Sequence, residues 1–468
     1  MENEIKNQEA TAVPAQPEMT AQTETPAKVE APSQEPGMKK INIEKFSPRM
    51  LMELDACTRC GECSNWCPAY DQDNREPLTP RGRATLFKGI IARQHGAFRA
   101  GSFLGNLAGT RPVTDEEMKA FAKDLYACST CMQCHYVCPV AIDTVELWER
   151  IRETVVDCGY GPLDSQKDLV LKTKNYDNPW GQPRSSRARW GKLAKKKKRI
   201  KEEPRDISKS KSEVLYYVGC TASYDNNVEE VAINTTNILH GAGVDFGILG
   251  NKEKCCGSVL LRMGERESFL RLCNENIEQF HDLGIKTLIT SCAGCFKTIK
   301  MDYAKIRGMN FEIKHTCEYI VDLIKLKKLT LTTPVNLTVT YHDPCHLGRH
   351  SGVFDAPREL LSMIPGVKLI EMERIRENSR CCGAGGGLKS GYPDMQNMIS
   401  QKRVTDAINT GATELVSACP FCYQGLQVGI QAMNAPVKMR DITELVCMAM
   451  GIESGAGGKD EGGEADGE

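Results

Sequence analysis

The sequence predicts an α+β multidomain protein in which a helical block precedes two tandem α/β units. Two observations predict this class. Residues 213–451 repeat one order of short apolar strands and helical stretches, which is typical of parallel-sheet α/β units. Residues 43–160 carry helix-start signals and few β-branched runs. The chain of 468 residues is long enough for two to four domains.

The expected organisation begins and ends in tails that should not fold. The parts are a disordered tail at 1–42, a helical domain at 43–160, a basic linker at 161–212, a first α/β domain at 213–333, a second at 334–451 and a disordered Gly/acid-rich tail at 452–468. The tails and the linker are polar and have few apolar residues, so they cannot bury enough surface to fold.

The helical block contains three helix-start signals. Ser47 followed by Pro48 supplies a cap residue and a proline at the first helical position. Thr114 and Glu117 form a capping box that starts a helix running up to Cys128. Asp143 is expected to cap a further helix through TVELWERIRETVV.

Each α/β copy places cysteines at predicted strand ends. The first strands are VLYYVGC (214–220) and LTVTYHDPC (337–345), and both end in cysteine. The second strands, VDFGIL and VKLIEM, precede a Cys-Cys-Gly triplet. The third, KTLITSC and TELVSAC, end in the first cysteine of a C-x-x-C that opens a helix. We expect ligands to gather at the carboxyl ends of these strands.

Cysteine usage indicates metal ligation in a reducing compartment. The chain has 22 cysteines, yet it is too long for a small secreted disulfide scaffold. The sequence shows no secretory signal and no run of 18 or more apolar residues. We therefore expect a cytoplasmic protein without a transmembrane segment of its own, and the net charge of −1 points to no particular partner and to no nucleic acid.

Two runs in the helical block have the spacing of bacterial ferredoxins, C-x2-C-x2-C-x3-C-P. Three close thiolates hold three corners of a cubane, and the fourth commonly serves the other cluster. The expected sets are Cys57, Cys60, Cys63, Cys138 and Cys128, Cys131, Cys134, Cys67. A pair of zinc knuckles is the alternative, which two complete copies with proline after the fourth cysteine disfavour.

The α/β repeat carries five cysteines per copy at closely matched intervals. They are Cys220, Cys255, Cys256, Cys292 and Cys295 in the first copy and Cys345, Cys381, Cys382, Cys419 and Cys422 in the second. Adjacent cysteines have Cα atoms about 3.8 Å apart, too close for an unstrained disulfide, and they rarely supply two corners of a zinc tetrahedron. A larger inorganic body with several metal atoms could accept both. Four cysteines without a repeat partner are assigned to packing: Cys158, Cys273, Cys317 and Cys447.

These units resemble the cysteine-rich CCG domains of heterodisulfide reductase. The resemblance rests on the paired C…CCG…C-x-x-C pattern, on TYHDPCHLGRHSG around Cys345 and on LTPRGRATLFKG after the first cluster motif. A two-cubane ferredoxin domain followed by two CCG domains is similar to the D-type subunit of that family and to iron–sulfur subunits of membrane complexes associated with sulfite reduction. The resemblance covers about residues 45–450.

The resemblance implies two cubane and two noncubane [4Fe–4S] clusters, each noncubane cluster held by one five-cysteine set. Its adjacent thiolates, Cys255 with Cys256 and Cys381 with Cys382, would serve different irons of the catalytic clusters, and Gly257 and Gly383 would let the backbone bend close. The family further implies a disulfide substrate, a membrane cytochrome b-type or soluble electron donor, and a peripheral position on the inner face of the cell membrane. An electron-transfer subunit of a glycolate- or lactate-oxidising flavoprotein complex is the alternative, and a zinc-bound interaction protein is a third.

Three further features allow two interpretations each. His342, His346 and His350 surround Cys345, and we expect them to hydrogen-bond cluster sulfurs or substrate rather than bind metal. The GAGGG stretch at 383–387 lacks the Lys-Ser/Thr of a phosphate loop and is expected to be flexible. The KKKK run at 195–198 is expected to be solvated, with anionic lipid or an acidic partner as the alternative.

Overall fold

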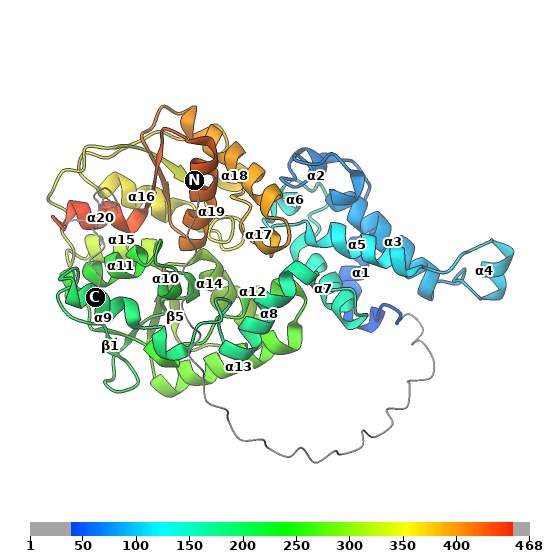
Figure 1. Cartoon of the computed structure of the whole chain (residues 1–468), viewed down its shortest axis with the longest axis horizontal. Coiled ribbons are helices and arrows are strands. Elements are labelled where there is room, and N and C mark those ends of the chain that lie inside the picture. Colours follow the sequence, from blue (N-terminus) through cyan, green and yellow to red (C-terminus); the bar gives the residue numbers. More distant parts are fainter. Residues whose placement is uncertain (1–38, 453–468) are drawn as a thin grey trace, which may run out of the picture. The chain divides into compact units, whose positions relative to one another are not determined.

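The computed structural model describes residues 39–452, which follow one another as a helical block and two α/β units (Figure 1). The N-terminal block is helical, as predicted, with short 3-10 turns at Ile43–Lys45 and Glu76–Leu78. Its helices are α1 (Pro48–Asp55), α2 (Glu62–Asn65), α3 (Pro80–His95), α4 (Phe103–Leu107), α5 (Asp115–Tyr126), α6 (Gln133–Tyr136) and α7 (Thr144–Asp157).

The predicted helix starts are present. The Ser47 side chain accepts from the Met50 amide, and Thr114 and Glu117 form a reciprocal capping box at the start of α5. Asp143 caps α7 through the Glu146 amide. These caps satisfy amides at the start of each helix that have no partner within it, which is why short local patterns located them correctly.

The folded block starts earlier than the predicted boundary at residue 43. The predicted tail lies outside the described residues up to residue 38, but Ile41 is completely buried. Its amide donates to Gln94 Oε1 at 2.9 Å, and its carbonyl contacts His95 Nε2 at 2.7 Å. Residues 453–468 of the second predicted tail also lie outside the described part.

Residues 161–212 contain packed helices, so the prediction of a low-order linker is wrong. They form α8 (Asp164–Tyr176), a 3-10 turn (Arg184–Ser186) and α9 (Arg189–Lys196), and then β1 (Arg205–Asp206) joins the first sheet. Trp190 is 2% exposed and belongs to the main hydrophobic core. The basic residues of α9 remain exposed on its other face. The segment was predicted not to fold because these charged residues outnumber the few apolar residues that pack into the core.

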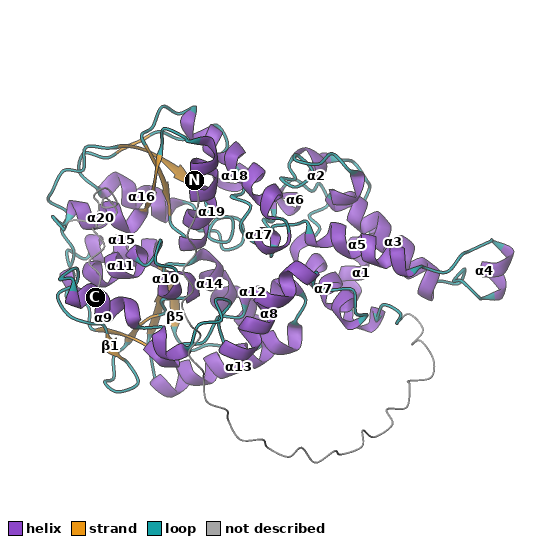
Figure 2. Cartoon of the chain, in the orientation of Figure 1, coloured by secondary structure: helices purple, strands orange, loops and turns teal. Residues whose placement is uncertain are grey.

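The first α/β unit holds a five-stranded parallel sheet with the order β1-β3-β2-β4-β5. Its edge strands β1 and β5 are labelled in Figure 2, where strands are orange. Its further strands are β2 (Val214–Tyr216), β3 (Phe246–Ile248), β4 (Thr287–Thr290) and β5 (Glu312–His315). Its helices are α10 (Cys220–Tyr224), α11 (Glu230–Gly241), α12 (Ser258–Met263), α13 (Arg266–Leu283), α14 (Ala293–Lys297) and α15 (Thr316–Lys325). A π-helical turn at Thr298–Asp302 follows α14.

The second unit holds a four-stranded parallel sheet with the order β7-β6-β8-β9. Its strands are β6 (Thr338–His342), β7 (Lys368–Leu369), β8 (Glu414–Ser417) and β9 (Lys438–Asp441). Its helices are α16 (Asp355–Met363), α17 (Leu388–Gly391), α18 (Pro393–Ile408), α19 (Pro420–Met433) and α20 (Ile442–Ala449). All six predicted strands exist, whereas β1, β5 and β9, which are not followed by a repeat cysteine before the next strand, were missed.

One buried arginine connects the helical block to both α/β units. Arg152 of α7 donates to the carbonyls of Arg262 at 2.7 Å and Gly386 at 2.8 Å, and to Leu125 and Cys128 within the helical block. Its side chain is completely buried, and burial lowers the pKa of the guanidinium without neutralising it. The three cysteine-bearing parts therefore share one hydrogen-bonded centre.

Candidate metal centres

A cavity between the two ferredoxin-type runs gathers cysteines from both. Its lining includes Cys57, Cys60, Cys63, Cys134 and Cys138. Gly61 approaches it with φ of 91°, and a Cβ there would lie 2.6 Å from the Arg81 guanidinium. The cavity brings Cys138 of the second run to the first three cysteines, as in the predicted first set, and it also contains Cys134, which the prediction gives to the second set.

Cys67 of the first run faces the second run. Burial, together with Cys128 and Cys131, raises the pKa of Cys67 to about 11. The Thr130 amide donates to Cys128 Sγ at 3.4 Å, and Thr144 Oγ1 lies 2.9 Å from Cys134 Sγ. A group of buried thiols can ionise together only beside a cation, and these donors and the all-sulfur ligand set fit an iron–sulfur cluster.

The first five-cysteine set is buried and continuous. The thiol of Cys255 makes hydrogen-bonding contact with Cys220 and Cys256, and Cys295 makes such contact with Cys256 and Cys292. Their residues are between 3% and 9% exposed. Hydrogen bonds from Cys255 and Cys295 lower the pKa of Cys256 to about 6. The five thiols therefore face one another instead of being dispersed in the core.

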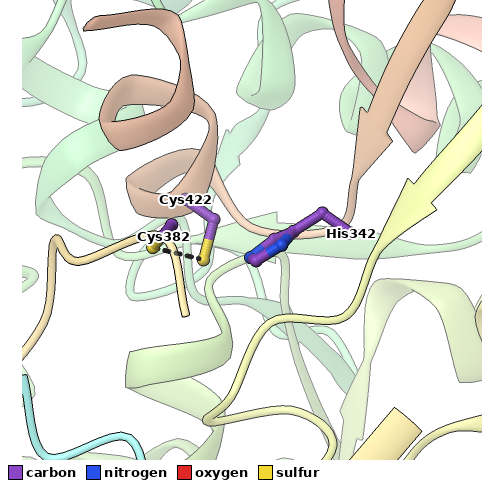
Figure 3. Close-up of side chains that lie close together, drawn as sticks. All are labelled: His342, Cys382 and Cys422. Atoms are coloured by element: carbon purple, nitrogen blue, oxygen red, sulfur yellow. Dashed lines mark hydrogen bonds between the residues drawn. The ribbon is translucent and has the colours of Figure 1, made fainter. Parts of the chain in front are cut away.

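The second set repeats this arrangement. Cys381 contacts Cys345 and Cys382, and Cys422 contacts Cys382 and Cys419. The Cys382 and Cys422 sulfurs are 3.5 Å apart (Figure 3). The first cysteine follows a strand, the pair precedes a helix and the C-x-x-C opens a helix, as expected for sites at the carboxyl ends of parallel strands.

The glycine after each cysteine pair turns an amide toward sulfur. Gly257 has φ of 77° and donates to Cys255 Sγ at 3.4 Å. Gly383 has φ of 78° and donates to Cys381 Sγ at 3.3 Å. A Cβ at Gly257 would lie 2.9 Å from the Phe269 ring. Left-handed backbone and close packing both require glycine here.

The GAGGG stretch is tightly packed, so the predicted flexibility is wrong. A Cβ at Gly386 would lie 2.4 Å from the Cys128 carbonyl oxygen, and one at Gly385 would lie 2.8 Å from that of Ser129. A Cβ at Gly387 would overlap the Met263 side chain at 1.9 Å. The glycines therefore let the second α/β unit approach the backbone of the second ferredoxin-type run.

Cysteine contacts also connect the sets to one another. Cys131 of the helical block is a neighbour of Cys381, and Cys292 of the first α/β unit is a neighbour of Cys419 of the second. Arg349 reinforces the first junction by donating to the carbonyls of Cys131 and Ser379, both at 2.7 Å. The second five-cysteine set thus lies between the ferredoxin-type block and the first five-cysteine set.

Protein families and relatives match both kinds of domain. The 4Fe-4S dicluster domain matches residues 53–142, and the cysteine-rich domain matches residues 214–300 and 339–427. The D-type subunit of the dihydromethanophenazine:CoB–CoM heterodisulfide reductase of Methanosarcina mazei is 39% identical over 421 residues, which cover 88% of this chain and 98% of that protein. The chain belongs to the family of D-type heterodisulfide reductase subunits.

Membership of this family confirms the predicted resemblance, the fold class and an iron–sulfur oxidoreductase subunit. More distant relatives include the probable iron-sulfur-binding oxidoreductase FadF of Bacillus subtilis, 33% identical over 87% of this chain and 61% of that protein. The EtfAB:quinone oxidoreductase of Syntrophomonas wolfei is 31% identical over 87% of this chain and 60% of that protein. Within residues 39–452, no helix combines the length and apolarity needed to cross a membrane.

A buried ion pair beside the first five-cysteine set was missed by sequence reasoning. Arg187, from the segment predicted to be a linker, donates to Cys220 Sγ at 3.5 and 3.6 Å and to Glu253 at 2.5 Å. Glu253 also accepts from the Val218 and Gly219 amides at 3.1 and 2.9 Å. The only sequence signal is the charged residue ahead of the cysteine pair, in EKCC; nothing local marks Arg187 as its partner.

His342 lies behind the second set in a fixed tautomer. Arg403 Nε donates to His342 Nδ1 at 3.2 Å, which leaves the proton on Nε2. Figure 3 shows the ring turned toward the sulfurs of Cys382 and Cys422, and one ligand atom of each residue lies within 4.8 Å of the others. Burial lowers the pKa of this imidazole to about 3. The geometry supports a neutral N–H donor toward the second centre.

The other two histidines connect the second set to the helical block. His346 Nδ1 lies 3.3 Å from Cys345 Sγ, and its ring stacks on His350 with centroids 4.3 Å apart. His350 Nε2 contacts the Thr130 carbonyl at 2.9 Å. Burial lowers the pKa of both rings, so neutral imidazoles occupy this junction.

The four cysteines assigned to packing lie apart from these contacts. Cys273, Cys317 and Cys447 are completely buried in the main core, and Cys447 Sγ donates to the Asn234 carbonyl at 3.5 Å. Cys158 Sγ lies 3.5 Å from the Lys40 carbonyl. Burial in the core is consistent with packing for Cys273, Cys317 and Cys447, whereas Cys158 is only partly buried.

Proposed function

We propose that the chain is the catalytic and electron-transfer subunit of a heterodisulfide reductase-like complex. Its substrate class is a disulfide, which it reduces with electrons from a cytochrome b-type or other donor subunit. The observation that carries the proposal is that Cys292 of the first five-cysteine set and Cys419 of the second are neighbours, so the two sets lie next to each other. The identity with the Methanosarcina subunit over nearly its whole length supports the same reaction class.

The proposed cofactors are two cubane clusters in the helical block and two noncubane [4Fe–4S] clusters in the α/β units. When bound, they supply one-electron carriers along the chain. The two ferredoxin-type sets would hold the cubanes, and each five-cysteine set would hold one noncubane cluster.

The order of the sets suggests a direction of entry. Cys60 is exposed at the first cubane set, whereas the ten cysteines of the α/β units are at most 9% exposed. Electrons would therefore enter at the Cys60 side, continue through the set containing Cys131 and reach the second five-cysteine set through the contact with Cys381. The buried end of this path excludes water from the reacting sulfurs.

Disulfide reduction consumes two electrons and two protons, breaks the S–S bond and releases two thiols. Each carrier normally passes one electron, so two facing centres suit a two-electron reaction better than one. The roles of this chain are to hold Cys255, Cys256, Cys381 and Cys382 at the reacting centres and to keep the imidazoles beside the second centre neutral. We further propose a cytoplasmic location, peripheral on the inner face of the cell membrane.

The relatives FadF and EtfAB:quinone oxidoreductase favour one alternative. In it the chain relays electrons one at a time for a separate flavoprotein, and it carries out no disulfide chemistry, as in a complex that oxidises glycolate or lactate. The same cysteine path would serve this function.

Anaerobic reduction of disulfides by a viologen donor separates the two functions. We expect two viologen radicals to be oxidised and two thiols to appear per disulfide consumed. Candidate small-molecule and small-protein disulfides are compared in parallel with isolation of the native complex. Absence of disulfide turnover together with a co-purifying flavoprotein that reduces the clusters would assign the relay function instead.

A further inference from the structure

The segment between α3 and α5 exposes a concentrated set of apolar side chains. Figure 1 shows α4 at the end of a hairpin that projects beyond these two helices. Phe98 is 57% exposed, Phe103 83%, Leu104 42% and Leu107 79%. The other large exposed apolar residues in the described part are scattered singly, which is normal for a protein surface. We refer to residues 96–113 as the α4 hairpin.

Polar contacts, rather than its apolar side chains, hold the α4 hairpin in shape. Ser102 Oγ accepts from the Gly105 amide at 3.0 Å and donates to the Arg99 carbonyl at 2.7 Å. The Thr110 amide closes the turn on the Gly105 carbonyl at 2.8 Å. A Cβ at Gly105 would lie 2.0 Å from the Arg99 carbonyl oxygen, so the turn is compact. The exposed phenylalanine and leucine side chains therefore do not stabilise the turn that carries them.

The charged residues within the α4 hairpin are both arginines. Arg99 and Arg111 are exposed, and residues 96–113 contain no aspartate or glutamate. Arg93 and Arg111 share the carboxylate of Glu117, at 2.9 and 2.8 Å. Positive charge therefore lies on the hairpin itself, whereas the carboxylates of Asp115, Glu116 and Glu117 stand in the first turn of α5, where Lys119 pairs with Asp115.

This chemistry fits an anionic lipid surface better than a protein. Its four exposed apolar side chains lie at a projecting tip, which suits shallow insertion into a lipid surface without burial of the rest of the chain. Aromatic and leucine side chains beside arginines are typical of segments that enter the boundary between lipid headgroups and acyl chains. Anionic headgroups attract basic residues near the surface.

We propose that the α4 hairpin inserts Phe98, Phe103, Leu104 and Leu107 into the headgroup boundary of an anionic bilayer. The chain would then attach to the membrane directly, in addition to any integral partner. The Lys195–Lys198 run, which has charge without exposed apolar neighbours in α9, is not the anchor. This attachment is independent of the substrate, so its failure leaves the proposed reduction chemistry untouched.

Vesicle sedimentation of the anaerobically purified full chain tests the proposal. We expect binding to phosphatidylcholine vesicles that contain phosphatidylglycerol, weaker binding to pure phosphatidylcholine, and a fraction that resists high salt because apolar insertion is not screened. The Phe103→Ser/Leu107→Ser variant should lose about tenfold in partitioning to anionic vesicles. The Leu171→Ser/Leu326→Ser variant is the matched control, since its residues are 55% and 66% exposed elsewhere.

Insertion itself has a direct readout. Because the wild type has four tryptophans, the readout is the difference in emission between Phe103→Trp and the wild type. This difference should shift to the blue on anionic vesicles and be quenched by brominated acyl chains. Equal iron content and visible absorbance of all variants show that they are folded. The proposal is overturned if the wild type does not bind vesicles or binds only a membrane-protein subunit. It is also overturned if the Phe103→Ser/Leu107→Ser variant binds as well as the wild type, or if replacing Lys195–Lys198 by glutamine abolishes binding instead.

Discussion

Replacing Arg187 by methionine would remove the cation between Glu253 and Cys220. The Arg187 and Glu253 side chains are 2% and 1% exposed, so the variant leaves a buried carboxylate with only two backbone amides as partners. Loss of one partner of a buried pair costs about 3–5 kcal/mol. Because Arg187 also donates to Cys220, we expect iron to be lost selectively from the first five-cysteine set.

A double-mutant cycle with Glu253→Gln isolates this interaction. We expect Arg187→Met/Glu253→Gln to be less destabilised than the sum of the single variants, because the double variant contains no unpaired buried charge. Urea unfolding under anaerobic conditions, followed by circular dichroism, gives the free energies, and iron analysis gives the loading. The exposed pair Arg271–Glu275 is the matched control, where the same substitutions should cost at most about 1 kcal/mol.

The reasoning is refuted if Arg187→Met keeps full iron content and unfolds within about 0.5 kcal/mol of the wild type. Replacing Arg187 would then cost no more than replacing a surface residue. The Arg187 side chain would not be needed to hold iron in the first five-cysteine set.

Three further predictions address the clusters and the core. The anaerobically purified protein should be brown and carry about sixteen irons per chain, and stoichiometric zinc with little iron would end the iron–sulfur assignment. Cys256→Ser and Cys382→Ser should each abolish disulfide reduction while both cubanes remain reducible, because the facing centres act as a unit; Cys317→Ser is the control and should keep full iron and activity. Substantial turnover by either of the first two variants would favour the relay function. Burial raises the pKa of Asp441 to about 7 in the folded state. At pH values between the unfolded and the folded pKa, this carboxyl group is therefore protonated in the folded chain and ionised in the unfolded chain. The contribution of Asp441 to wild-type stability should fall by about 1.4 kcal/mol per pH unit between these two values and level off above the folded one. Urea unfolding of Asp441→Asn should therefore show a pH slope smaller by that amount, and an unchanged slope would exclude Asp441 as a source.

The sequence by itself determined the elements whose signals are local. The caps at Ser47, Thr114 and Asp143 start helices because they satisfy amides within the next turn. The cysteine-ended strands were also predictable, since a short apolar run followed by a ligand is visible in one stretch of chain and is repeated in the second copy. The repeat separated the ten cysteines with a counterpart from Cys273, Cys317 and Cys447, which the structure places in the core.

Only the tertiary structure decided which residues from distant segments contact one another. Neither Arg187 nor Arg152 carries a local pattern, because their partners lie 33 or more and 24 or more residues away. No local pattern ordered the cysteine sets either, since their order follows from the contacts of Cys131 with Cys381 and of Cys292 with Cys419. Spacing along the chain fixes which thiols can share a cluster, whereas the neighbours of that cluster depend on how separate sheets and helices pack.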